Sequence, residues 1–220
     1  MSLATTGAGR SKGQNAAIPW WAVVTGVTPW AAYAPKGAAS LAASLVDLTG
    51  NGNNAGDPGG AATPGWDAVN GWTFDGLAQY LTTTFLSQND QSQSAFVQFT
   101  NGLGTTRCIF GHGAGADKEF LLFRQVGTGV RYANGGLVNV WGNIAAGNLG
   151  IAGNRGYRNG VAEGAAIGAW EGAVPGTGLT IGAYAGFTYF DQVNIQSFII
   201  YSVALDEPQA ALIAAAMAAL

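Results

Sequence analysis

The side chains with the greatest capacity for chemistry are sparse, with one histidine and one cysteine among 220 residues. His112 would need a partner serine for a triad or further ligands for a metal site, so we interpret it as a loop histidine that follows a strand. Cys108 lies in the apolar run Cys-Ile-Phe, where a free cysteine usually behaves as a small buried hydrophobe. Neither residue predicts nucleophilic catalysis.

Glycoside hydrolysis requires a pair of carboxyl groups that face the sugar, so acids two residues apart on one strand would predict it. Asp117 and Glu119 have this spacing, but they straddle a predicted boundary between a loop and a strand, with Lys118 between them. We therefore predict no catalytic residues and no enzymatic activity. A polysaccharide hydrolase is the third and least favoured of our hypotheses.

Calcium is the one cofactor that the acidic residues suggest, because it binds carboxylate and backbone oxygens of loops. Asp47, Asp75 and Asp191 are predicted at loops or strand ends and form the candidate calcium site. Asp47 and Asp75 have an alternative role as turn caps that accept hydrogen bonds from backbone N–H groups.

Aromatic rings beside loops rich in Asn and Gly are the pattern that we expect of a glycan-binding surface. Five residues have this setting: Trp141, Trp170, Phe187, Tyr189 and Phe190. The strongest candidate is the run at 185–190, which is dense in rings within a predicted loop. Packing in the core is the alternative for each of the five rings.

Residues 1–17 are rich in Gly, Ala, Ser and Thr, which predicts a flexible arm. We expect this arm and the tryptophan-rich stretch after it to anchor the chain to partner subunits, since Trp is enriched at interface centres. The residues assigned to anchoring are Arg10, Lys12, Trp20, Trp21 and Trp30. The alternative places the three tryptophans in the core.

The charge content and the positions of proline and glycine argue against two classes of partner, nucleic acids and membranes. Only 10% of the residues are charged and the net charge is −3, which argues against nucleic-acid binding through phosphates. The apolar residues 18–33 are interrupted by Pro19, Gly26 and Pro29, so they do not predict a membrane helix. The first residues lack the apolar region of a secretory signal, and we expect no signal peptide.

Short runs with frequent turn signals predict about ten to fourteen strands. Residues 72–74 and 80–83 flank the turn dipeptide Asp75-Gly76 and predict a bent or hairpin-like pair of strands. A second hairpin is predicted at 129–141, where Asn134-Gly135-Gly136 separates two strands.

The clearest predicted strand is 193–201, where alternation sorts the side chains onto two faces. Val193, Ile195, Ile199 and Tyr201 fall on one face, and Asn194 and Gln196 on the other. Residues 36–48 have leucines at helical spacing, so a short helix is one alternative, but we favour a loop followed by a strand at 44–48.

The chain ends in a predicted helix at 207–219, which is rich in alanine. Asp206 is the expected N-cap, and Gln209 lies three residues further on as a variant of the capping box. The apolar stripe that would dock this helix on a sheet consists of Leu212, Ile213, Met217 and Leu220.

The fold class that follows is all-β, a two-sheet antiparallel jelly-roll sandwich with a short C-terminal α-helix. We predict a single domain at 18–220, within which 18–43 is a candidate anchoring extension.

Four motifs, in this order, resemble those of laminin-G-like and concanavalin A-like jelly-roll domains. They are the D-x-T-G-N-G-N at 47–53, the W-T-F-D-G at 72–76, the Y-R-N-G at 157–160, and the L-T-I-G at 179–182 followed by the strand that ends at Leu205. The resemblance covers about 44–220. It departs from the family at Asp191-Gln192, where a glycine is usual, and at Gln196-Ser197, where an acidic pair is usual.

The resemblance implies a concanavalin A-like fold, which lectins and adhesion modules share. The alanine- and glycine-rich ending is similar to versions found in bacteriophage virion proteins. We therefore expect a non-enzymatic virion structural protein, as a head decoration, fibre or tail component, that assembles with other virion subunits or copies of itself and contacts glycans. The second hypothesis is a free lectin that requires calcium.

Overall fold

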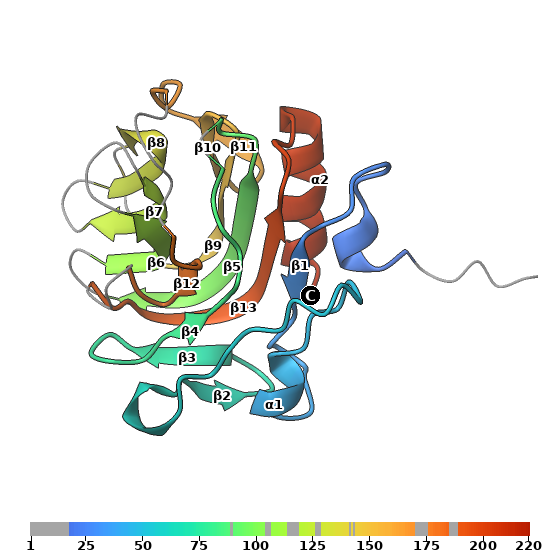
Figure 1. Ribbon diagram of the computed structural model, residues 1–220, viewed down its shortest axis with the longest axis vertical. Helices are drawn as coiled ribbons and strands as arrows, with labels where there is room; N and C mark the ends of the chain where they lie inside the picture. The colour runs from blue at the N-terminus through green and yellow to red at the C-terminus, as the bar shows by residue number, and fades with distance from the viewer. Residues whose placement is uncertain are drawn as a thin grey trace, which may run out of the picture.

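The computed structural model describes residues 18–88, 90–103, 107–113, 119–125, 129–140, 142, 144–169, 176–184 and 189–220. The chain forms two antiparallel β-sheets that face each other, with one long helix at the C-terminal end (Figure 1). This arrangement confirms the predicted all-β sandwich with a C-terminal helix.

The larger sheet has eight strands in the order β11-β10-β9-β5-β13-β3-β2, and β1 also pairs with β13. Its strands are β1 (Ala31–Tyr33), β2 (Gly65–Asp67), β3 (Gly71–Asp75), β5 (Ser94–Leu103), β9 (Gly147–Ala152), β10 (Arg155–Arg158), β11 (Val161–Glu163) and β13 (Gln192–Tyr201).

The smaller sheet has five strands in the order β4-β12-β6-β7-β8. Its strands are β4 (Leu81–Thr82), β6 (Arg107–Gly113), β7 (Glu119–Gln125), β8 (Gly129–Val140) and β12 (Thr180–Ile181). The helical segments are η1 (Trp20–Ala22), α1 (Leu41–Ser44), η2 (Gly60–Ala62) and α2 (Glu207–Ala218).

The main core lies between the two sheets. Alternate residues of each strand point inward, so that Phe99 of β5 and Phe198 of β13 meet Phe110 and Phe120 from the smaller sheet. Trp72 is fully buried in this core, and its indole N–H donates to Ser44 Oγ at 2.7 Å.

A second core lies on the other side of the eight-stranded sheet, under α2 (Figure 1). Ile213 and Met217 of the helix pack with Phe96, Ile199 and Tyr201 of the strands. The predicted capping box is confirmed, because Asp206 accepts from the Gln209 N–H at 2.9 Å and the Gln209 side chain accepts from the Asp206 N–H. Of the four residues predicted to dock this helix, Ile213 and Met217 are buried, but Leu212 and Leu220 are exposed, so the prediction is wrong for these two.

Neither predicted hairpin forms. β3 and β4 do not pair, because the turn at Asp75-Gly76 carries the chain from the eight-stranded sheet to the five-stranded sheet. The hairpin within 129–141 is wrong, because β8 runs without a turn. Asn134 instead donates its side-chain amide to the Gly153 carbonyl at 2.8 Å, and the Gly136 N–H donates to the Gly168 carbonyl.

Two other local predictions are corrected. In the segment 36–48, the favoured strand is absent and the alternative helix is present as α1, which the Ser40 hydroxyl caps by accepting from the Ala43 N–H. Neither α1 nor any other helix in the described part of the chain is long and apolar enough to cross a membrane.

Candidate functional site

The outer face of the five-stranded sheet carries an apolar cluster that strand alternation alone does not require. Phe120 and Leu122 of β7 point into the main core, so Leu121 and Phe123 between them point outward. Phe123 is nevertheless only 7% exposed, and it clusters with Cys108 and Ala133 from the neighbouring strands. Other residues must therefore cover this face.

The segment that begins with β12 supplies part of this cover. Thr180 and Ile181 pair with β6, and the Gly182 N–H donates to the Ile109 carbonyl at 2.7 Å. The chain returns to the same strand at Tyr189, whose carbonyl accepts from the Cys108 N–H at 2.9 Å. Both ends of the intervening loop are thus attached to β6, and Tyr184 and Tyr189 lie on its two sides.

Tyr189 is the most exposed ring of the cluster. Its ring centroid lies 5.3 Å from that of Phe123 and 6.4 Å from that of Tyr184, both in edge-to-face orientations. The side chain remains 53% exposed, and its backbone φ is +54°. Since a positive φ is unfavourable for a bulky residue and tends to occur at functional sites, Tyr189 is held in place at some cost in backbone energy.

Polar groups flank the rings. The Tyr184 hydroxyl donates to Glu119 Oε1 at 2.7 Å, which ties the loop to the first residue of β7. Arg131, which pairs with Phe123 across the strands, donates from Nε to Asn139 Oδ1 at 3.2 Å. Burial raises the pKa of the Cys108 thiol well above its ordinary value, and the carboxylates of Asp191 and Glu119 add to the shift. Cys108 is therefore an inert packing group, as predicted.

We define the aromatic platform as Tyr184, Tyr189 and Phe123, with Glu119 and Arg131 at its edges. Such a surface can stack against the apolar face of a sugar ring while neighbouring polar groups bind hydroxyls. Phe190, another predicted glycan contact, instead turns toward Tyr80, with centroids 6.4 Å apart. Trp141, Trp170 and Phe187 lie outside the described residues.

Each of the three acids of the candidate calcium site has its own hydrogen-bond or ion-pair partners. Asp47 is buried and accepts hydrogen bonds from the backbone N–H groups of Ala32, Thr49 and Asn53. Asp75 accepts from the N–H groups of the turn that follows it, chiefly Leu77 at 2.8 Å and Ala78 at 3.1 Å. The alternative role of both residues as turn caps is therefore present in the structure.

Asp191 is fully buried and forms a two-pronged ion pair with Arg124 of β7. Burial raises its pKa, and the guanidinium of Arg124 acts in the opposite direction. Within the described ranges, no three His, Cys, Asp or Glu side chains group as metal ligands would. Calcium binding therefore stays a prediction without a converging set of described ligands.

The three tryptophans assigned to anchoring pack against the core, as the alternative has it, and their contact with a partner stays a prediction. Trp30 packs against the main core, with its ring 5.2 Å from that of Phe85, and Trp20 and Trp21 pack against the core under α2. All three stay partly exposed. Arg10 and Lys12 lie outside the described residues.

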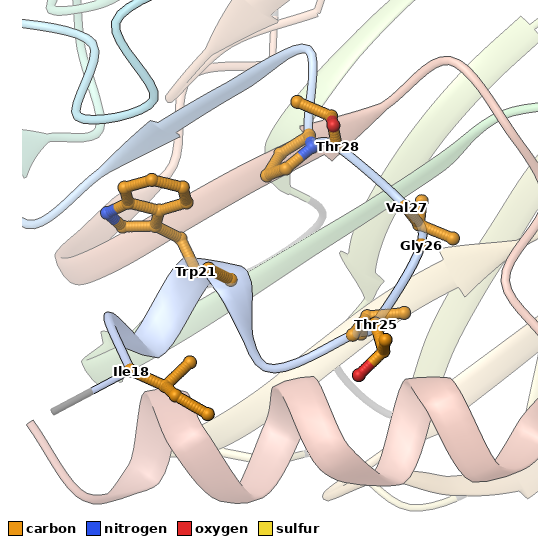
Figure 2. A pocket seen from close by; sticks show the side chains of 9 residues that line it. Ile18, Trp21, Thr25, Gly26, Val27 and Thr28 are labelled. Carbon is orange, nitrogen blue, oxygen red and sulfur yellow. The ribbon is translucent and has the colours of Figure 1, made fainter. Parts of the chain in front are cut away.

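Trp21 also lines a pocket of about 490 Å³ whose wall is formed by residues from Ile18 to Pro29. Figure 2 shows Ile18 and Thr25 on the side of the pocket next to α2, the Trp21 ring directed away from that helix, and residues 25–28 completing the wall. Ile18 is 71% exposed at the edge of this pocket. The pocket lies on the side of the eight-stranded sheet that α2 covers, away from the aromatic platform.

Sequence reasoning identified Tyr189 but missed its supports. Nothing local marks Phe123 as an outward residue that packs against Tyr189, because β7 reads as an almost continuous apolar run. Glu119 was considered as a catalytic acid, whereas the structure gives it the Tyr184 hydroxyl as a partner. The one available signal was the density of rings at 184–190.

Comparison by sequence gives no relative: no family model matches the chain, and no curated protein matches it. Comparison of structures gives many neighbours. A Trypanosoma rangeli sialidase in complex with sialic acid is 14% identical, with a TM-score of 0.56 over 84% of this chain. The chain spans about a third of that sialidase, namely 32% of its length.

Two further neighbours have the same level of similarity. Domain 4 of AbnA, a GH43 extracellular arabinanase from Geobacillus stearothermophilus in complex with arabinotriose, is 16% identical, with a TM-score of 0.57; the match covers 86% of this chain and 98% of that one. The HCR/D W1238A mutant is 11% identical, with a TM-score of 0.57, and the match covers 86% of this chain and 51% of that one. At these identities the similarity shows a shared sandwich fold.

Proposed function

We propose that this protein is a non-enzymatic jelly-roll module that contacts glycans through the aromatic platform. The observation that carries the proposal is the exposed Tyr189 ring, which is held at positive φ against Phe123 on the outer face of the five-stranded sheet. A rigid aromatic group loses little conformational entropy on binding, so a preformed platform favours stacking on a sugar.

The arrangement of the two sheets supports a protein that attaches to a partner by one side and presents its glycan-binding surface on the other. The eight-stranded sheet is covered by α2 and the residues that line the pocket, whereas the platform lies on the five-stranded sheet at the opposite side of the sandwich (Figure 1). One side is thus available for attachment to a partner while the other side meets a ligand.

The comparison with domain 4 of the arabinanase also supports the proposal. That domain is matched over nearly its whole length, and it was solved with arabinotriose bound. It is therefore a separate domain of this fold that holds an oligosaccharide.

Hydrolysis receives less support from the geometry. Glycosidases need two carboxyl groups about 5–10 Å apart that face the sugar. Glu119 flanks the platform but is hydrogen-bonded to Tyr184, and its predicted partner Asp117 lies outside the described residues. We therefore propose glycan binding and not glycoside hydrolysis.

The setting that we propose is a bacteriophage virion, in which the chain is a decoration, fibre or tail component bound to other virion subunits or to copies of itself. This rests on the sequence resemblance. Deletion of residues 1–17 tests it: the truncated protein should keep its melting temperature but lose incorporation into the particle or oligomer. Normal assembly of the truncated protein would contradict the anchoring role.

The glycan proposal is tested by screening the purified protein on a glycan array and measuring each hit by titration calorimetry. We expect binding in the micromolar to millimolar range, as is usual for a shallow site with one or two stacking rings. Calorimetry should give the same affinity with and without a chelator, because the platform contains no metal ligand set among the described residues.

A further inference from the structure

The side of α2 that faces away from the sheet has the composition of a buried surface. Ala210, Ile213 and Met217 pack toward the strands, so the positions between them point outward. After Glu207, the exposed positions of the helix all carry apolar side chains, and they are Pro208, Ala211, Leu212, Ala215 and Ala218. A helix that is apolar on every side is normally buried, so this outward side is typical of a surface that a partner covers.

Large exposed side chains extend this surface on both sides of the helix. The turn between β10 and β11 packs on α2, since a Cβ at Gly160 would lie 2.9 Å from the Ala211 Cα, and Val161 after it is 64% exposed. On the other side η1 contacts α2, preceded by the exposed Ile18. Leu212, which is 52% exposed, lies on the ridge between them. We define the α2 face as the exposed residues of α2 together with Ile18 and Val161.

Neither the N-terminal segment of the chain nor a glycan matches the α2 face. The segment 1–17 joins the chain at Ile18, but its only large apolar residues are Met1 and Leu3. The exposed side chains of α2 beyond Gln209 contain no hydrogen-bonding group that could orient a sugar. A second apolar protein surface is the better match.

The α2 face is complementary to itself. Leu212 is the one large side chain on the outward ridge of α2, and small side chains flank it at Ala211 and Ala215. Where two copies of α2 cross near these residues, each Leu212 lies over the alanines of the second copy. Small residues at the crossing allow the two helix axes to approach to about 8 Å, so the surfaces can interlock.

The charges at the ends of α2 select the direction of the pair. Asp206 and Glu207 are exposed at the N-terminal end, and the last turn contains no basic residue. Parallel pairing would bring the acidic ends of both copies together. Antiparallel pairing separates these ends and places the two helix dipoles in the favourable opposite directions.

The basic residues of the N-terminal segment fit the antiparallel direction. Figure 1 shows η1, in blue, beside the half of α2 that is nearer the C-terminus, so the N-terminal segment joins the chain there. Its only charged side chains are Arg10 and Lys12, and six residues separate Lys12 from Ile18, a span of at most about 20 Å. Antiparallel pairing brings the acidic end of the second copy's α2 to this half of the helix, within reach of the two basic side chains.

We propose that two copies of this chain associate through their α2 faces, with the helices antiparallel and a two-fold axis near Leu212 and Ala215. Two-fold pairing through one shared surface is the commonest arrangement of identical subunits. The inference rests on the proposed attachment by this side of the sandwich and specifies the partner. The aromatic platforms lie on the far sides of the two sandwiches, so the dimer presents two glycan-binding surfaces in opposite directions.

Sedimentation velocity of the full chain between about 1 and 200 µM tests the association. A contact one helix wide is small for a stable interface, so we expect a Kd in the micromolar range and a shift from monomer to dimer over this series. Leu212→Glu should weaken the dimer at least about tenfold, because it places a charge within an apolar contact. Leu77→Glu is the matched control, since Leu77 is exposed on the turn that leads to the five-stranded sheet, and it should dimerise as the wild type does.

Cysteine crosslinking tests the direction, and the native Cys108 does not interfere because it is buried. Ala215→Cys should form a disulfide between copies, since residues beside the two-fold axis come within the Cα separation of about 7 Å that a disulfide allows. Ala219→Cys lies one turn further from the axis on each copy, which adds about 12 Å in an antiparallel pair, and should stay reduced. A disulfide at 219 and none at 215 would contradict the antiparallel direction.

The remaining outcomes separate this interface from the glycan function. A wild type that stays monomeric throughout the series, or an equal Kd for Leu212→Glu and the wild type, would overturn the dimer and leave the glycan function intact. A dimer that binds no glycan would retain the interface and refute the platform. Monomers that bind phosphatidylcholine vesicles, with loss of binding in Leu212→Glu, would assign the α2 face to a membrane and overturn the dimer.

Discussion

The Tyr184 hydroxyl donates a 2.7 Å hydrogen bond to Glu119 Oε1, which joins the loop after β12 to the start of β7. The two residues are 65 positions apart in the sequence, so the bond fixes one side of a long-range contact. The other side is fixed by the Tyr189 carbonyl, which accepts from Cys108. Together these bonds hold two rings on the outer face of the five-stranded sheet.

Tyr184→Phe removes the hydroxyl and keeps the ring. We expect a loss of about 1 kcal/mol in the free energy of unfolding, because Glu119 is partly exposed and water replaces the lost donor. Chemical denaturation measures this loss. A loss above about 3 kcal/mol would show that Glu119 is buried more deeply than its partial exposure indicates.

Asp191→Asn should be far more damaging, because it leaves Arg124 buried beside a neutral amide. We expect a loss of about 3–5 kcal/mol in the free energy of unfolding, as is usual when one partner of a buried ion pair is removed. Asp57→Asn is the matched control, since Asp57 is exposed and caps its own turn. A similar loss in both variants would contradict the assigned role of the ion pair.

Calcium should leave the melting temperature unchanged. The Asp191 carboxylate pairs with Arg124, and the Asp47 carboxylate accepts hydrogen bonds from three backbone N–H groups. The two carboxylates therefore do not direct free lone pairs at one shared position where calcium could bind. Differential scanning calorimetry with calcium and with a chelator measures the effect. A rise with calcium that is lost in Asp47→Ala would instead support the free calcium-dependent lectin.

His112 predicts a dependence of stability on pH. It lies within β6 and not in the predicted loop, so that prediction is wrong. The side chain is buried, its Nδ1 bonds the Thr177 carbonyl at 2.9 Å, and its Nε2 meets the Ser87 hydroxyl. Burial lowers its pKa below the ordinary value of 6.5. Between the two pKa values the unfolded state binds more protons, so the free energy of unfolding should be highest above about pH 6.5 and should fall as the pH falls towards the folded-state pKa.

Denaturation at several pH values between 5 and 8 checks this dependence. His112 is the only histidine of the chain, so His112→Gln should flatten the curve over this range. An unchanged slope in the variant would show that other groups are responsible.

Gly150 tests the packing under α2. A Cβ at this position would lie 2.1 Å from Cδ1 of Phe96, so Gly150→Ala should cost about 1–3 kcal/mol through overpacking. At Gly176 a Cβ would meet no atom within 4 Å, which makes Gly176→Ala the control with an expected change near zero. Equal melting temperatures for the two variants would contradict the packing described for Phe96.

Features determined by local chemistry were predictable from the sequence. The capping box at Asp206 and Gln209 is one example, because its partners are three residues apart and need no tertiary contact. The turn at Gly153-Asn154 between β9 and β10 is another. The fold class followed from the sum of such signals.

Features determined by tertiary contacts were not predictable. Val193 and Ile195 face the main core, but a bulge between Ile195 and Ser197 shifts the register, so that Ile199 and Tyr201 face α2 instead. The prediction that all four share one face is therefore wrong beyond the bulge. A single extra residue reverses every later side chain, and the alternation of the sequence does not reveal it.

The candidate site also combines a feature that the sequence reveals with one that depends on tertiary contacts. The ring density near Tyr189 is visible in the sequence, whereas its contact with Phe123 depends on which face of β7 Phe123 occupies and where Tyr189 lies in the fold.

The central claim is that Tyr189 is the main glycan contact, and affinity in Tyr189→Ala tests it most directly. Trp21→Ala is the control, because it removes a partly exposed ring from the opposite side of the sandwich. For the tightest glycan found on the array, calorimetry should show at least about tenfold weaker binding by Tyr189→Ala and unchanged binding by Trp21→Ala. Unchanged affinity in Tyr189→Ala, in a protein that stays folded, would contradict the account.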